Sequence, residues 1–288
     1  MPIPESQFER WSNQGAVTTA KQTHESIRIA LDSYNWPNGK PEVYLQGSYK
    51  NNTNIRGDSD VDVVVQLNSI FRSNLTEAQK QRFGVTKATY SWYDFREDVK
   101  KALKEYYGSS KIQEGKKTLK VQTSYLPADV VVCIQYRKYP SNANSVDNYV
   151  EGMTFYVPSE CFWIVNFPKL HYQNGVEKNQ RTNGWYKPTI RVFKNARTYL
   201  IDQGAPQDLA PSYFLECLLY NVPDNKFGNT FQDTFLNVIN WLHKANLSEF
   251  RCQNEQDNLF GYSPVQWSEE KAKRFLSYME ELWDNWGW

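Results

Sequence analysis

Three aspartates have the spacing needed to hold divalent metal ions. Asp60 and Asp62 alternate with valines, and because neighbouring strand residues point to opposite faces, both carboxylates should share one face, about 7 Å apart along the chain. Asp129 opens a second apolar, β-branched run, as a buried strand beside the first would. Two Mg²⁺ ions held about 3.5–4 Å apart by carboxylates clamp an in-line phosphoryl displacement. We predict that Asp60, Asp62 and Asp129 form a catalytic, metal-binding triad that binds two Mg²⁺ ions, for which Mn²⁺ can substitute.

A turn upstream of the first two aspartates has the residue types of a phosphate site. Gln46, Gly47 and Ser48 precede a short polar stretch. Glycine lets a backbone approach a phosphate closely, and serine can cap a helix whose first N–H groups favour an anion. We predict nucleotide contact at all three residues. Asp58 is interpreted as a turn residue after Gly57, because a fourth inward carboxylate would add repulsion.

These motifs together resemble a known family. Gln46-Gly47-Ser48, Asp60-Val61-Asp62 and Asp129 resemble the nucleotidyltransferases of the polymerase β type, and among them the bacterial cGAS/DncV-like enzymes, or CD-NTases. Further stretches resemble clade E of that family, and nearly the whole chain is covered. They are Gly115 to Val121, Asn166 to His171, Lys187-Pro188 with Arg191 to Lys194, and Pro211 to Glu216.

The resemblance implies both a fold and an activity. The implied fold is α+β: a polymerase β-like nucleotidyltransferase core with a mixed sheet and helices, joined to a C-terminal helical lobe, the two lobes flanking a central active-site cleft. The implied activity is synthesis of a cyclic dinucleotide second messenger in antiphage (CBASS) signalling. In this family the product is typically read by a separate effector protein.

Periodicity along the chain predicts the elements that position these residues. Helix formers from Ser6 to Tyr34 predict one long scaffold helix. Strands are expected at 42–46, 60–67, 117–124 and 128–136, with a short pair at 153–157. Helices are expected at 92–107, 187–203, 211–221, 229–245 and 268–286. Polar breakers near 140–145 suggest two domains: a catalytic core with the scaffold helix at 1–150, and a mainly helical lobe that completes the nucleotide cleft at 151–288.

Cations in the second half could bind a triphosphate. Arg191 and Lys194 are three residues apart and share a helix face, while Ser212 begins the next helix with free N–H groups. The resemblance assigns triphosphate binding to Lys194 and Ser212. The alternative is a helix with ordinary solvent-facing cations.

Two residues are candidates for contact with the base. Tyr213 is expected to stack on it, although a tyrosine buried in the helical core is an alternative. Asn166 lies where clade E members that prefer pyrimidines carry Asn, and a side-chain amide suits a uracil edge; the alternative is a turn-forming Asn before an X-Pro step. The expected substrates are UTP and ATP and the expected product is cyclic UMP-AMP, with cyclic di-UMP next. In the family that this chain resembles, members that make the all-pyrimidine product carry Arg or Gln two residues before a Trp in this region. This chain has Cys161 two residues before Trp163, which weakens cyclic di-UMP as the product.

Composition limits the remaining classes. The 33 basic and 32 acidic residues leave a net charge of +1, so no global field favours stable nucleic-acid binding and an oligonucleotide-type or RNA-terminal nucleotidyltransferase is disfavoured. The 4 cysteines and 3 histidines form no zinc motif. An inactive nucleotide-binding module should lack a carboxylate or the Gly-Ser turn, and both are intact. We expect a monomer in the reducing cytoplasm with no membrane association.

Overall fold

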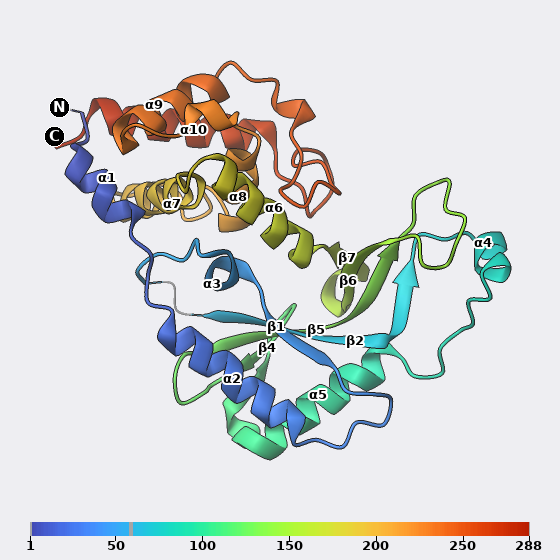
Figure 1. The fold of residues 1–288 in the computed structure, drawn as a ribbon. Helices are drawn as coiled ribbons and strands as arrows, with labels where there is room; N and C mark the ends of the chain where they lie inside the picture. Colours follow the sequence, from blue (N-terminus) through green and yellow to red (C-terminus); the bar gives the residue numbers. More distant parts are fainter. Residues whose placement is uncertain (1, 58–59, 288) are drawn as a thin grey trace. The chain divides into compact units, whose positions relative to one another are not determined.

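The chain folds as two compact units that interleave along the sequence. The computed structural model describes residues 2–57 and 60–287 (Figure 1). One unit, here the sheet unit, consists of residues 16–49 and 59–168, and the other, the helical unit, of residues 1–15, 50–58 and 169–288. Both units draw on the first 150 residues, whereas the sequence suggested a single cut near that point. The division into functional domains at 1–150 and 151–288 stays a prediction.

The sheet unit is built on a seven-stranded mixed sheet. The central path runs β1-β2-β5-β4-β3, and β6 and β7 continue from β5. The β2 and β5 strands are parallel and the other pairs are antiparallel. The strands are β1 (Glu42–Leu45), β2 (Val61–Ser73), β3 (Ile112–Glu114), β4 (Leu119–Val121), β5 (Ala128–Lys138), β6 (Val150–Val157) and β7 (Phe162–Asn166).

The two longest strands run side by side through the core of this unit. Their valine-rich starts are buried, as in strands covered on both faces. Two helices, α2 (Thr18–Asp32) and α5 (Trp92–Tyr107), cover one face of the sheet (Figure 1). Helix α5 begins with a capping box between Ser91 and Asp94 and buries the predicted apolar face, so its prediction is confirmed. The short helices α3 (Gly47–Asn51) and α4 (Glu77–Arg82) lie in connections.

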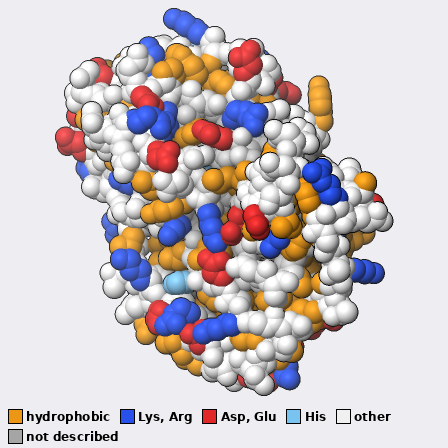
Figure 2. Space-filling view, turned by 45° about the vertical axis from the view of Figure 1, so that its right-hand side comes forward, with side chains coloured by type: hydrophobic (Ala, Val, Ile, Leu, Met, Phe, Trp, Pro, Cys, Tyr) orange, Lys and Arg blue, Asp and Glu red, His pale blue; other side chains and the backbone are white. Residues whose placement is uncertain are grey.

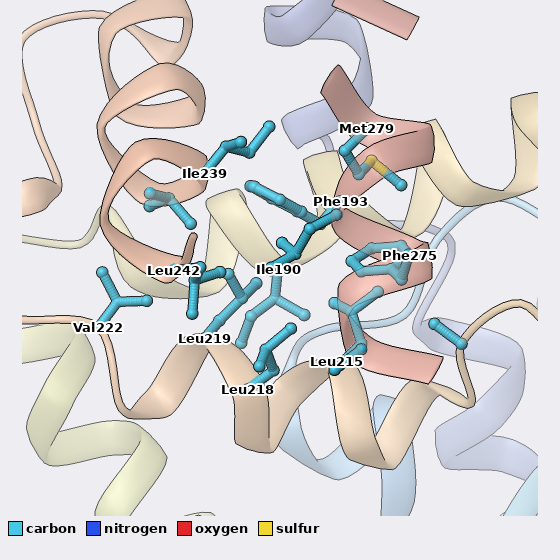
Figure 3. Close-up of a cluster of buried hydrophobic side chains, with 14 of the residues drawn as sticks. Ile190, Phe193, Leu215, Leu218, Leu219, Val222, Ile239, Leu242, Phe275 and Met279 are labelled. Carbon is cyan, nitrogen blue, oxygen red and sulfur yellow. The ribbon is translucent and has the colours of Figure 1, made fainter. Parts of the chain in front are cut away.

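The helical unit packs its apolar faces around helix α7. Side chains from α7, α8, α9 and α10 interdigitate in one cluster of buried residues, including Phe193, Leu218, Ile239 and Phe275 (Figure 3). The helices are α1 (Glu5–Ser12), α6 (Pro168–Arg181), α7 (Tyr186–Asp202), α8 (Ser212–Tyr220), α9 (Phe231–Leu242) and α10 (Glu269–Asp284). The α+β class, with a mixed sheet and a helical C-terminal part, is therefore confirmed.

The prediction of one helix from Ser6 to Tyr34 is wrong. The chain forms α1 and α2 with a break between them. At the break, the Gly15 N–H donates to the Asn54 carbonyl at 3.1 Å, and a Cβ on Gly15 would lie 2.6 Å from the Ile55 carbonyl oxygen. This close approach needs glycine, and it replaces the helical hydrogen bond that the periodicity had suggested. Helix α6 and strands β3 and β7 were not predicted.

Candidate active site

Two of the three predicted carboxylates lie directly opposite each other in the sheet. Asp62 of β2 is the register partner of Asp129 of β5 in the parallel pair. Residues in register on neighbouring strands point to the same face, so the side chains of these two aspartates project together. Asp60 is exposed and stands just before β2 begins. Asp58, interpreted above as a turn residue, lies outside the described residues.

The third carboxylate contacts strand β4 and the residue just before it. The Thr118 hydroxyl donates to Asp129 Oδ1 at 3.2 Å, and Lys120 Nζ lies 3.6 Å from the same oxygen. Lys120 is also the register partner of Asp129 in the antiparallel β4–β5 pair. The side chain of Asp129 is 25% exposed, so it faces polar groups and solvent rather than packed hydrocarbon.

The Gly-Ser turn lies against the second carboxylate. Gly47 has a φ of +66°, which favours glycine, and a Cβ there would lie 2.1 Å from Asp62 Oδ2. The Gln46 N–H donates to the Asp62 carbonyl at 3.0 Å. Helix α3 begins at Gly47 and includes Ser48. Glycine is therefore required here for the close approach to Asp62, while phosphate contact by Gln46, Gly47 and Ser48 stays a prediction.

The donor set suits a hard divalent cation. Among residues 2–57 and 60–287, no three acidic, histidine or cysteine side chains are gathered into a formed metal site, so metal binding by the triad stays a prediction. The residues fit the ion nonetheless, since Asp62 and Asp129 share a face and carboxylate oxygens are the ligands that Mg²⁺ prefers. No soft ligand is needed from the cysteines.

Lys194 is not an ordinary solvent-facing lysine. It is 1% exposed, and its Nζ donates to Glu216 Oε1 at 2.7 Å and to the Thr53 carbonyl at 3.1 Å. The solvent-cation alternative is therefore wrong for this residue. Its predicted contact with a triphosphate is untested and stays a prediction.

The other predicted cation, Arg191, binds backbone carbonyls. Its Nε donates to Ser12 and its Nη1 to Asn52, each at 2.5 Å. Burial lowers the pKa of Arg191 to about 10, so the guanidinium stays charged at neutral pH. Ser212 is the first residue of α8, and its Oγ accepts from Arg197 at 3.2 Å. The triphosphate contacts predicted for Arg191 and Ser212 also stay predictions.

The two base candidates occupy different settings. Tyr213 is 40% exposed, yet burial beside Cys217 and Cys252 raises the pKa of its hydroxyl well above the usual value, so the residue is partly exposed while its hydroxyl end lies in the helical core. Its ring stacks on His171 with centroids 5.2 Å apart and planes inclined by 24°. Asn166 is the last residue of β7 and pairs with Met153 of β6, which places it in a strand rather than in a turn. Base contact by either residue stays a prediction.

A buried cluster in the helical unit was missed. Glu216 accepts hydrogen bonds from Lys194, Thr53, Asn51 and His171. His171 and Glu216 end two of the stretches that resemble clade E, but neither residue has a role predicted from the sequence. The available signal was Glu216, which interrupts the apolar and aromatic run from Tyr213 to Tyr220, where a buried charge needs a partner.

Acidic, basic and hydrophobic side chains are interspersed on the face shown in Figure 2, without a large area of one sign. Within the described residues, no helix combines the length and apolar character that crossing a bilayer requires.

Comparison with known proteins identifies the family. Residues 27–148 match the nucleotidyltransferase domain, and residues 173–286 match the cGAS/DncV-like nucleotidyltransferase C-terminal helical domain. The chain is 75% identical over 287 residues to a cyclic UMP-AMP synthase of Rhodothermus marinus, with 100% of both chains covered. The chain belongs to the cGAS/DncV-like nucleotidyltransferases. It is thus an enzyme of the cyclic dinucleotide synthase class.

A solved structure and a more distant relative show how far the similarity extends. A structure of Rhodothermus marinus CdnE c-UMP-AMP synthase with Apcpp and Upnpp matches with a TM-score of 0.98 and 74% identity, covering 100% of this chain and 98% of that one. A cyclic dipurine nucleotide synthase of Elizabethkingia meningoseptica is 31% identical, with 100% of both chains covered. Nucleotidyltransferases of this superfamily generally use divalent metals. The nucleotidyltransferase fold and the clade E resemblance are confirmed.

Proposed function

We propose that this enzyme makes cyclic UMP-AMP from UTP and ATP with two Mg²⁺ ions, for which Mn²⁺ can substitute. The observation that carries the proposal is the 75% identity, over the whole length of both chains, to a cyclic UMP-AMP synthase. The dipurine synthase at 31% identity makes clear that base choice varies among relatives. The higher identity is what favours this product over others.

The carboxylates of the sheet unit would hold the metal ions. Asp60, Asp62 and Asp129 are the proposed ligands, with Asp62 and Asp129 in register on neighbouring strands. When bound, the ions supply neutralisation of phosphate charge and acidification of the attacking hydroxyl. The Thr118 hydroxyl donates a hydrogen bond to Asp129 Oδ1 and so orients this carboxylate. No histidine base is required.

The remaining proposed contacts hold the substrates. Ser48 and Ser212, with Arg191 and Lys194, are proposed to bind triphosphates, Tyr213 to stack on a base, and Asn166 to read the uracil edge. In each transfer, a ribose hydroxyl attacks the α-phosphorus of a nucleoside triphosphate, the new phosphodiester forms, and pyrophosphate leaves. A second transfer within the linear intermediate closes the ring.

The biological setting follows as part of the same proposal. The product is read by a separate effector protein in antiphage signalling, and the synthase works as a monomer in the cytoplasm without stable nucleic-acid partners. Near-neutral net charge supports the last point, because 33 basic residues are offset by 32 acidic ones.

Product analysis tests the proposal. The enzyme is incubated with every pair of the four NTPs and Mg²⁺ or Mn²⁺, treated with phosphatase, and analysed by mass spectrometry. The expected result is a phosphatase-resistant product with the mass of cyclic UMP-AMP from UTP plus ATP. Cyclic di-UMP as the main product would revise the choice of base, and a failure to incorporate UTP in every mixture would refute it.

A further inference from the structure

Glu216 is the centre of a buried polar cluster in the helical unit. Its Oε1 accepts from Thr53 Oγ1 at 2.6 Å and from Lys194 Nζ at 2.7 Å. Its Oε2 accepts from Asn51 Nδ2 at 3.1 Å and lies 3.1 Å from His171 Nε2. The carboxylate is 3% exposed. A buried carboxylate with this many partners has one fixed orientation, and it fixes its partners in turn.

The charge of Glu216 determines the tautomer of His171. Burial alone would raise the pKa of Glu216. Lys194 and His171 lower this pKa by more than burial raises it, so the pKa of Glu216 is well below the usual range. The carboxylate is therefore ionised and can only accept, so Nε2 of His171 carries a proton and donates. Among the described residues, His171 Nδ1 has no hydrogen-bond partner. Glu216 is thus the group that holds the imidazole in its plane.

The fixed imidazole supports the exposed ring of Tyr213. His171 is 5% exposed and Tyr213 is 40% exposed, and the two rings are stacked with their centroids 5.2 Å apart. Helix α6 supplies His171, and helix α8 supplies both Tyr213 and Glu216. The hydrogen bond and the stacking contact together join these two helices at the proposed base-binding residue.

We infer that His171 is a positioning residue for nucleotide recognition: Glu216 holds its imidazole, and the imidazole holds the Tyr213 ring in the plane that stacks on the base. This rests on the proposed function, in which Tyr213 contacts a base. The Tyr213 hydroxyl also lies against Cys252 and Cys217, so its position and the stacking on His171 together hold the ring before a ligand arrives, and ordering it costs less when a base binds. The same carboxylate holds Lys194, so one buried group orients a base contact and a triphosphate contact.

Substitution of His171 tests the inference through binding rather than chemistry. His171→Leu keeps an apolar side chain of similar size but removes both the ring and the bond to Glu216. We expect the KM for UTP to rise about 3–10-fold, as loss of one aromatic stacking contact would cause, with kcat nearly unchanged. Inhibition by inorganic tripolyphosphate, which has no base, should stay at the wild-type level.

A double-mutant cycle separates positioning from direct contact. Tyr213→Ala should raise the KM for UTP at least as much as His171→Leu, and the double variant should bind UTP no worse than Tyr213→Ala alone, because His171 acts through Tyr213. His243→Ala is the matched control, since His243 pairs with Glu280 outside the cluster; its KM should not change. Additive effects in the double variant, or an unchanged KM in either single variant, would overturn the inference.

Two measures keep the result decisive. Melting temperatures are recorded for each variant, and if His171→Leu does not fold, His171→Met, which also lacks the ring and the bond to Glu216, replaces it in the same cycle with the same criteria. The dissociation constant of a non-hydrolysable UTP analogue is measured beside turnover. A wild-type enzyme that binds the analogue but yields no cyclic UMP-AMP contradicts the proposed function, whereas the cycle on the dissociation constant still decides the role of His171.

Discussion

Asp62 and Asp129 meet because two parallel strands bring them into register, and each has a different neighbour. Gly47, which has no Cβ, leaves room for Asp62 Oδ2, and the Thr118 hydroxyl donates a hydrogen bond to Asp129 Oδ1. The alternation of Asp62 with valines and the apolar run after Asp129 were visible in the sequence and suggested neighbouring strands. The role of Thr118 was not predictable, because it depends on the pairing of β4 with β5, which local pattern does not specify.

Loss of one triad carboxylate should stop the reaction without unfolding the protein. Asp62→Asn keeps the size of the side chain but removes the charge that a divalent ion requires. We expect product formation to fall by about 10³-fold or more, as for loss of a main electrostatic group, with an unchanged melting temperature. Product is measured by mass spectrometry. Substantial activity in this variant would show that Asp62 is not a metal ligand.

The hydroxyl of Thr118 should matter through the orientation of Asp129. Thr118→Val keeps the shape of the side chain and removes the donor, whereas Thr118→Ser keeps the donor and serves as the control. For Thr118→Val we expect kcat to fall about 10-fold, the cost of about 1.4 kcal/mol for a lost bond to a charged group, and a higher Mg²⁺ concentration for half-maximal rate. Thr118→Ser should restore most of both values. Equal behaviour of the two variants would contradict this role.

Asn166 should select the base. Asn166→Ser shortens the side chain and removes the amide that can both donate to and accept from a uracil edge. We expect use of UTP to decline and use of purine triphosphates to increase, seen as a changed product ratio in competition between labelled NTPs. Thr154, a buried neighbour in strand β6, offers a control through Thr154→Val, which should leave the ratio unchanged. An unaltered ratio in Asn166→Ser would exclude base readout by this residue.

At the scale of elements, the helical unit depends on polar contacts as well as on its apolar core. Helices α7 and α8 share the cluster shown in Figure 3, and the Lys194–Glu216 pair joins the same two helices beside it. The apolar periodicity of α7 to α10 allowed these four helices to be predicted. The periodicity did not reveal that Lys194 points inward, because a single lysine in a helical pattern can either face solvent or pair with a buried group.

Stability should depend on Glu216 in a pH-dependent way. Its pKa in the folded protein is below its ordinary value, so its contribution is present above the unfolded pKa of about 4.3 and is lost as pH falls towards the folded value. At pH 7, Glu216→Gln should lower the free energy of unfolding by about 3–5 kcal/mol, because Lys194 is left buried and unpaired.

Urea unfolding of both proteins between pH 7 and pH 3 measures this effect. The difference between wild type and Glu216→Gln should shrink below about pH 4.3, as the wild-type protein loses the contribution of the ionised carboxylate. Glu280→Gln, at a carboxylate more than half exposed, should change the free energy of unfolding by less than about 1 kcal/mol at any of these pH values. A difference for Glu216→Gln that is constant with pH would contradict an ionised, paired Glu216.

At the scale of the whole molecule, the enzyme class could be predicted from sequence because the motifs are spread along the chain and each has a distinct chemical role. The interleaving of the two units could not be predicted from the sequence. It depends on residues 50–58 belonging to the helical unit, where Thr53 and Asn51 bind Glu216. Such a long-range contact leaves no periodic signal in a polar loop.

The near-neutral net charge also sets an expectation for the whole molecule: RNA binding should be weak and should vanish at moderate salt.

We propose above all that three carboxylates of the sheet unit converge on divalent ions, and the most direct test is a crystal structure with Mn²⁺ and a non-hydrolysable UTP analogue. Anomalous scattering locates Mn²⁺ without ambiguity. We expect two Mn²⁺ peaks about 3.5–4 Å apart, bound by oxygens of Asp60, Asp62 and Asp129 and by the phosphates of the analogue. Mn²⁺ bound elsewhere, or bound without any oxygen of Asp129, would contradict it.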